Sequence, residues 1–146
     1  MPLLPRKAVL AVAAVTDIAL NARGRPVPAN ALATRHGLSS RHLEPVLQAL
    51  VRHGILKGTR GPRGGYELAR EARRITADDI LRAASTAVEL DCTPVGTAVL
   101  KSVVLPVVRQ AEEAFSAELA RINVEDLAHS AGELGRLAAQ SRLLSS

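Results

Sequence analysis

Apolar residues recur at helical spacing through the first third of the chain and predict three helices. The first covers residues 6–22, and the second is a short helix at 29–36. The second helix stops at Gly37, because glycine is best suited to the left-handed position after a helix. The third helix begins at a capping residue, Ser39 or Ser40, and ends near residues 52–54. In the first helix the recurring positions are Val9, Val12, Thr16 and Ala19.

The second and third predicted helices have the pattern of a helix-turn-helix. A small residue lets two helices approach closely, a glycine makes the turn, and an apolar stripe closes the angle between them. The helix at 29–36 supplies Leu32 and Ala33. The apolar stripe of the helix that follows Gly37 consists of Leu43, Val46, Leu47 and Leu50. Pro45 predicts either a distorted first turn or a later helix start. A helical hairpin with a solvated polar face remains the alternative interpretation.

The exposed start of the third helix is the candidate base-reading surface. In a DNA-binding protein these side chains lie at base edges in the major groove. Arg41 can bind guanine O6 and N7, and Glu44 can accept a hydrogen bond from cytosine N4. The candidate DNA-binding residues of this segment are Ser39, Ser40, Arg41, His42 and Glu44.

Two short strand patterns, "ILKGTR" and "YELAR", flank the glycine-rich run "RGPRGGY" and predict a hairpin. The side chains of Ile55, Tyr66 and Leu68 are available for its inner face. A phosphate-binding loop is excluded because the run lacks G-x-x-x-x-G-K-[ST] and leads into a strand. A hairpin directly after a helix-turn-helix is a wing. Glycines at its tip allow close backbone approach, and arginines there contact phosphates or a narrow minor groove. The candidate DNA-binding residues of the wing are Arg60, Arg63, Gly64 and Gly65.

The second half of the chain predicts a long helix that needs a partner. Thr76 caps a fourth helix, residues 85–96 form a loop, and the long helix runs from Pro106 to Ile122. A short helix at about 124–131 precedes a tail that either continues or frays. The apolar stripe and acidic outer face of the long helix favour a partner helix over the chain's own core. The candidate interface residues are Val104, Val108, Ala111, Phe115, Leu119 and Ile122.

Composition and charge agree with this outline. With one tyrosine and one phenylalanine among 146 residues, the core is aliphatic and alanine-rich, which favours helices. Residues 1–75 carry 13 basic and 4 acidic residues (+9), whereas residues 76–146 carry 6 and 10 (−4). A basic half indicates a polyanionic partner, with nucleic acid as the leading candidate. Asp17 and Lys101 interrupt the apolar runs, so we expect neither a signal peptide nor a membrane span. One cysteine indicates a cytoplasmic protein.

The segment "LATRHGLSSRHLEPVLQALVRHGILKGTRGPRGGYELAR", residues 32–70, resembles the winged-helix regulators of the Rrf-two family. The resemblance continues through "ITADDILRA" and "AFSAELARINVEDLA" and so covers most of the chain. It implies a mainly α fold with a small β-wing. It also implies a homodimer, crossed through the long helix, on a pseudo-palindromic operator of double-stranded DNA. The expected parts are a winged helix-turn-helix domain (1–84), a loop or sensor region (85–105), and a dimerisation helix with the C-terminal segment (106–146).

The sequence does not decide which signal this protein senses. Cluster-binding members of the family carry three cysteines before the dimer helix, whereas this chain has only Cys92. Because iron–sulfur clusters normally need four protein ligands, we expect neither a cluster nor another metal cofactor. Redox sensing by Cys92 is one hypothesis, although acidic neighbours oppose its thiolate form; a cysteine without a role is the other. A small molecule between the winged domain and the long helix is a further candidate signal.

The sequence therefore predicts a DNA-binding transcriptional regulator, with repression as the expected action. A winged-helix interaction module that docks on an enzyme or a chromosome-organising partner without reading DNA is the alternative. An enzyme is not expected, because the chain shows no nucleophile elbow, zinc-binding spacing or nucleotide loop.

Overall fold

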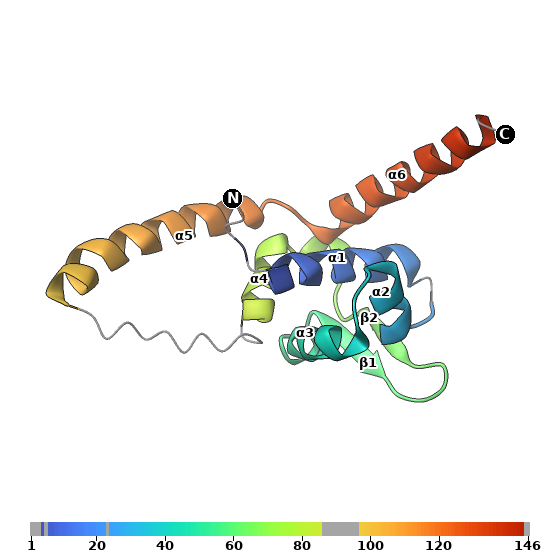
Figure 1. Ribbon diagram of the computed structural model, residues 1–146, viewed down its shortest axis with the longest axis horizontal. Helices are drawn as coiled ribbons and strands as arrows, with labels where there is room; N and C mark the ends of the chain where they lie inside the picture. Colours follow the sequence, from blue (N-terminus) through green and yellow to red (C-terminus); the bar gives the residue numbers. More distant parts are fainter. Residues whose placement is uncertain (1–3, 5, 23, 86–96, 145–146) are drawn as a thin grey trace.

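Helix α1 (Arg6–Asn21) lies at the centre of the fold, with α3 (Ser40–Arg52), α4 (Ala77–Ser85) and the start of α6 (Val124–Leu144) packed against it (Figure 1). The computed structural model describes residues 4, 6–22, 24–85 and 97–144. The expected fold class, mainly α with a small β-wing, is confirmed. The other elements are α2 (Ala29–Arg35), β1 (Leu56–Thr59), β2 (Gly65–Leu68), the 3₁₀-helix η1 (Ala72–Arg74), the π-helix η2 (Leu100–Val104) and α5 (Leu105–Leu119).

The first predicted helix is confirmed, but the recurring positions that we read from the sequence are not its most buried face. Val9 is 51% exposed, whereas Ala11, Val15 and Ile18 are fully buried. Residues 8–15 are apolar on every side, so periodicity alone could not choose the face. The structure turns the small alanines inward, which lets α4 and α6 pack closely on α1.

The helix-turn-helix forms as expected. Gly37 has a φ of +65°, and the Leu38 N–H donates to the Ala33 carbonyl across the turn at 2.8 Å. Pro45 lies inside α3, so the alternative of a later helix start is wrong. Because proline has no backbone N–H, the Arg41 carbonyl lacks its helical hydrogen-bond donor. Both residues are exposed, so water can donate to this carbonyl instead. The predicted stripe of α3 is confirmed as buried and consists of Leu43, Val46, Leu47 and Leu50.

The wing is a two-stranded antiparallel hairpin in which Leu56 pairs with Leu68 and Thr59 with Gly65. Its inner face meets the core through buried Ile55 and half-buried Tyr66 and Leu68, as expected. The sequence did not indicate a third partner. Val27, in the α1–α2 connection, exchanges two backbone hydrogen bonds with Tyr66, at 2.8 and 2.9 Å.

One segment of the second half is more helical than expected, and the C-terminal tail takes one of the two forms that the sequence left open. Residues 98–105, assigned to the loop, are helical and run through η2 into α5, so that the helix begins well before Pro106. Helix α6 continues without a break to Leu144, so of the two alternatives for the tail after residue 131 the structure has the continued helix. The fourth helix has the expected cap: the Asp79 N–H donates to the Thr76 hydroxyl and the Thr76 N–H to the Asp79 carboxylate, both at 3.1 Å. None of the described helices is long and apolar enough to cross a membrane.

Candidate DNA-binding surface

The start of α3 presents a polar surface whose reverse side is buried. Arg41, His42 and Glu44 are exposed, while the Leu43 side chain between them belongs to the core. Ser39 is the residue before the helix, as expected, but its hydroxyl makes no capping bond to the backbone. It lies 2.7 Å from Nδ1 of His42 and so orients that ring. The division of one helix into a buried and a charged face matches a recognition helix.

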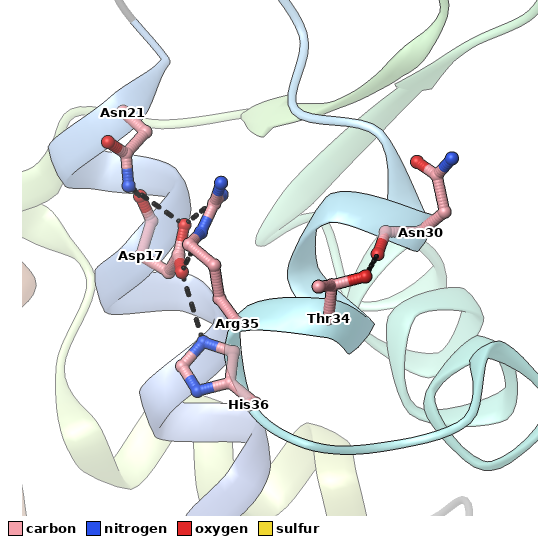
Figure 2. Close-up of polar contacts among 6 residues, drawn as sticks. All are labelled: Asp17, Asn21, Asn30, Thr34, Arg35 and His36. Atoms are coloured by element: carbon pink, nitrogen blue, oxygen red, sulfur yellow. Dashed lines mark hydrogen bonds and ion pairs between the residues drawn. The ribbon is translucent and has the colours of Figure 1, made fainter.

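A buried carboxylate, which the sequence did not single out, fixes α2 against α1. Figure 2 shows the Asp17 side chain on α1 facing Arg35 and His36 at the end of α2. Arg35 donates from Nε and Nη2 to the two Asp17 oxygens, at 2.8 and 2.6 Å. Asn21 Nδ2 and His36 Nε2 lie 2.9 and 3.0 Å from the same carboxylate. Because Gly37 and α3 follow directly, this cluster sets where the recognition helix begins.

The electrostatics of this cluster favour the ionised carboxylate. Burial alone would raise the pKa of Asp17, which is only 8% exposed. Hydrogen bonds from Arg35 and Asn21, together with the positive charge of Arg35, outweigh that effect and lower the pKa below its usual value. The hydrogen bond to Asp17 in turn raises the pKa of Arg35. Asp17 therefore stays charged in the folded protein at neutral pH.

An open groove of about 640 Å³ lies between α3 and the wing. Tyr66 lines it, and the pKa of this phenol is raised by burial first and by the Glu44 carboxylate second. Gln48 and Arg52 also line the groove from the exposed side of α3, and we did not identify either from the sequence. Both follow Glu44 at four-residue steps, so continuing the exposed stripe by one and two turns would have found them.

The wing tip brings arginines to the far side of the same groove. Arg60 directly follows β1 and lines the groove, whereas Arg63 is exposed on the adjacent flank. Gly64 and Gly65 have a structural reason to be glycine. A Cβ at Gly64 would overlap the Thr59 carbonyl oxygen, and a Cβ at Gly65 would overlap the Val27 carbonyl. They allow the hairpin to close, and direct contact with DNA by either glycine stays a prediction.

Helix α5 leaves the winged domain and carries almost no buried surface of its own (Figure 1). Of the predicted interface residues, Leu119 is half-buried and packs against the chain's own core, and Ala111 is exposed. The other predicted residues are exposed hydrophobics: Val104, Val108, Phe115 and Ile122. A second row next to them, Val99, Val103 and Val107, is also exposed, and we did not identify it from the sequence. Such a contiguous apolar surface marks an interaction site.

Comparison with known proteins supports the fold and identifies the family. The profile of the Rrf2 family, described as iron-dependent transcriptional regulators, matches residues 4–130. The chain belongs to the Rrf2 family. Among solved Rrf2-like structures, T. potens IscR superposes with a TM-score of 0.70 at 30% identity, covering 90% of this chain and 89% of that one. CymR, the global cysteine regulator of B. subtilis, superposes with a TM-score of 0.66 at 25% identity, covering 89% and 98%.

Curated relatives of this Rrf2 protein include HTH-type transcriptional regulators named IscR. Those of Escherichia coli O1:K1 / APEC and Cronobacter sakazakii are each 35% identical to it over 86 residues. The match spans 59% of this chain and 53% of each relative, so the chain spans about half the length of the curated relatives that it matches. The relatives named here are transcriptional regulators, not enzymes.

The family description includes iron, and the residues of this Rrf2 chain do not fit an iron–sulfur cluster held by cysteines. The sequence has one cysteine, whereas such clusters normally need four protein ligands. Within the described residues, no three histidine, cysteine or acidic side chains are grouped as they would be around a metal ion. Cys92 itself lies outside the described residues, and redox sensing by it stays a prediction.

Proposed function

We propose that this Rrf2-family chain is a sequence-specific DNA-binding transcriptional regulator that acts as a homodimer on a pseudo-palindromic operator. The observation that carries the proposal is the division of α3. Its buried stripe is anchored in the core, while Arg41, His42 and Glu44 face outward next to the wing. No acidic residue lines the groove, and Glu44 is the one acidic residue on the exposed start of α3. A surface of this charge suits a DNA backbone.

In this proposal α3 enters the major groove by its N-terminal end. Arg41 donates to guanine O6 and N7, and Glu44 accepts from the exocyclic amine of cytosine. The wing lies along the neighbouring backbone, where Arg60 enters the minor groove or contacts phosphates. Base contacts then set the sequence preference, and arginine–phosphate contacts set the orientation of the protein on the duplex. The Asp17 cluster holds α2 in place, so the Arg41 side chain is presented from a rigid support.

The homodimer is proposed from the exposed apolar rows of α5. Two rows of valines, continued by Phe115, lie along the helical segment 98–119, which includes η2 and α5 and has no buried residue in its own subunit. A second copy of α5 would cover them with a surface of the same kind, as a two-fold interface requires. Two winged domains held in this way would read two half-sites, and an inverted repeat in DNA is the matching target.

Selection from a random duplex library by the full chain tests the proposal. We expect an enriched inverted repeat with half-site centres about 10–10.5 base pairs, or a multiple of that spacing, apart. Binding to the selected duplex should weaken steeply as salt rises. Sedimentation velocity of the same sample measures whether the bound and free species are dimers. A chain that enriches no sequence and whose partner binding is insensitive to salt would instead be a protein-interaction module.

Repression is the finer part of the proposal, and it has a separate test. Operator binding represses when the site overlaps the promoter, because the bound dimer then excludes polymerase. Footprinting across the genome gives the position of each site, and transcript levels in a deletion strain give the sign of the effect. Raised transcripts from genes with overlapping sites support repression, whereas lowered transcripts would make the protein an activator.

A further inference from the structure

The connection between α1 and α2 forms part of the wing. The Val27 N–H donates to the Tyr66 carbonyl at 2.9 Å, and the Tyr66 N–H donates back at 2.8 Å. Gly65 lies so close to the Val27 carbonyl that no side chain would fit at this position. The connection is therefore fixed on the edge of β2. Arg25, two residues before Val27, is held on the flank of the hairpin instead of on a free loop.

Arg25 and Arg63 line the same cleft. It has a volume of about 540 Å³, and its remaining walls are three prolines and Gly64. Proline fixes its own φ, and two of the prolines, Pro26 and Pro28, flank the residue that pairs with β2. The walls are therefore stiff, and both arginine side chains are exposed at the rim.

The charge of this cleft is uncompensated. No acidic residue lines it, and among the ion pairs of the described residues neither Arg25 nor Arg63 has a carboxylate partner. Two like charges held in one cleft repel each other, and an anion between them removes that cost. The guanidinium group offers a planar fork of donors that matches phosphate geometry, so a phosphate is the suitable anion.

We propose that Arg25 and Arg63 together hold one phosphate of the DNA backbone on the flank of the wing. This inference rests on the proposed function, because the phosphate belongs to the DNA that α3 and the wing tip bind. It adds a contact from a segment outside the helix-turn-helix and the hairpin. The α1–α2 connection thereby takes part in positioning the protein along the duplex, without reading base sequence.

The test compares arginine variants of the full chain on the duplex selected by the wild-type protein. Each neutralised phosphate contributes about 0.9 to the slope of log affinity against log salt. In the double variant Arg25→Ala/Arg63→Ala, the magnitude of this slope should therefore fall by about 0.9 per protomer. For a dimer this makes the affinity loss between about 50 and 200 mM salt roughly tenfold smaller. Either single variant should lose only part of that slope, because the other arginine still holds the phosphate.

Two matched controls isolate the effect of the fork and the effect of charge. Arg25→Lys keeps the charge and loses the planar fork, so its slope should stay near that of the wild type while its affinity falls. Arg136→Ala removes an exposed arginine from α6, the helix that points away from the wing strands in Figure 1, and should change neither quantity. Thermal unfolding of each variant checks that the fold is retained.

Other outcomes would overturn the inference. If Arg25→Ala binds like the wild type while Arg63→Ala is weakened, Arg25 is not part of the contact, although DNA binding stands. If the double variant loses about 1.8 per protomer, the arginines hold separate phosphates. A wild-type chain that selects no duplex fails the proposed function itself.

Discussion

Replacing Asp17 with asparagine should destabilise the fold by about 2–3 kcal/mol. Removing one partner of a buried ion pair typically costs about 3–5 kcal/mol, because the other charge stays buried. Here Asp17 is 8% exposed, but Arg35 is 43% exposed, so its guanidinium regains water when the carboxylate is lost. Asparagine has almost the same shape and leaves no cavity. These two points place the expected cost at or below the lower end of that range.

The dependence on pH gives this prediction a second readout. The pKa of Asp17 is lower in the folded protein than its ordinary value, so its contribution is complete above the unfolded pKa of about 3.9. The contribution is lost as pH falls through the lower, folded pKa. The difference in unfolding free energy between wild type and Asp17→Asn should therefore be constant from about pH 7 to pH 5 and shrink below about pH 4.

Urea denaturation followed by circular dichroism measures both quantities. Glu118→Gln is the matched control, because its carboxylate pairs with Arg121 at 3.4 Å and both side chains are more than 70% exposed. That change should cost less than about 1 kcal/mol. If Asp17→Asn costs no more than the control, or if its cost is the same at pH 7 and pH 3, the carboxylate does not anchor α2.

Three further changes test the wing, the recognition helix and the dimer. Gly64→Ala should cost about 1–3 kcal/mol in urea denaturation, because its Cβ overlaps the Thr59 carbonyl; Gly135→Ala, where a Cβ meets nothing, should be neutral or stabilising. Arg41→Ala should lower discrimination at one operator position by about 1–3 kcal/mol in a repeated selection, and uniform weakening at all positions would make it a phosphate contact. Phe115→Asp should give a folded monomer in sedimentation velocity, and an unchanged dimer would remove α5 from the interface.

Sequence patterning predicted the parts of the fold in which apolar and polar positions alternate sharply. Helix α3 and its buried leucines could be placed because the leucines recur at helical spacing and Glu44, Pro45 and Gln48 between them are exposed. Helix α1 could be found, but its buried face could not, since alanines and valines occupy every side. The helical start before Pro106 was missed because proline suits the first turn of a helix and so predicted the start there, whereas Pro106 lies inside a helical segment that begins at residue 98.

The candidate site was predictable where it depends on local sequence and not where it depends on tertiary contacts. The glycine-rich run indicated the wing tip and its arginines without further help. The partner of Asp17 is 18 residues away, and Val27 reaches Tyr66 across 39 positions, so no spacing rule connects either pair. A lone carboxylate in an apolar helix was nevertheless a signal, because a buried acidic residue is rare without a partner.

In the proposed dimer, the contacts between α4 and α5 would hold α5 in a fixed position relative to the winged domain. Ser116 of α5 donates to Asp78 of α4 at 2.6 Å and accepts from Arg82 at 2.9 Å. The backbone is tied as well, since the Val124 N–H donates to the Ile75 carbonyl at 2.8 Å. In a dimer built through α5, these bonds transmit the position of the helix pair to each α3. The operator spacing would then depend on these hydrogen bonds as much as on the contact between the two α5 helices. A signal that breaks these bonds or separates the two helices would release DNA.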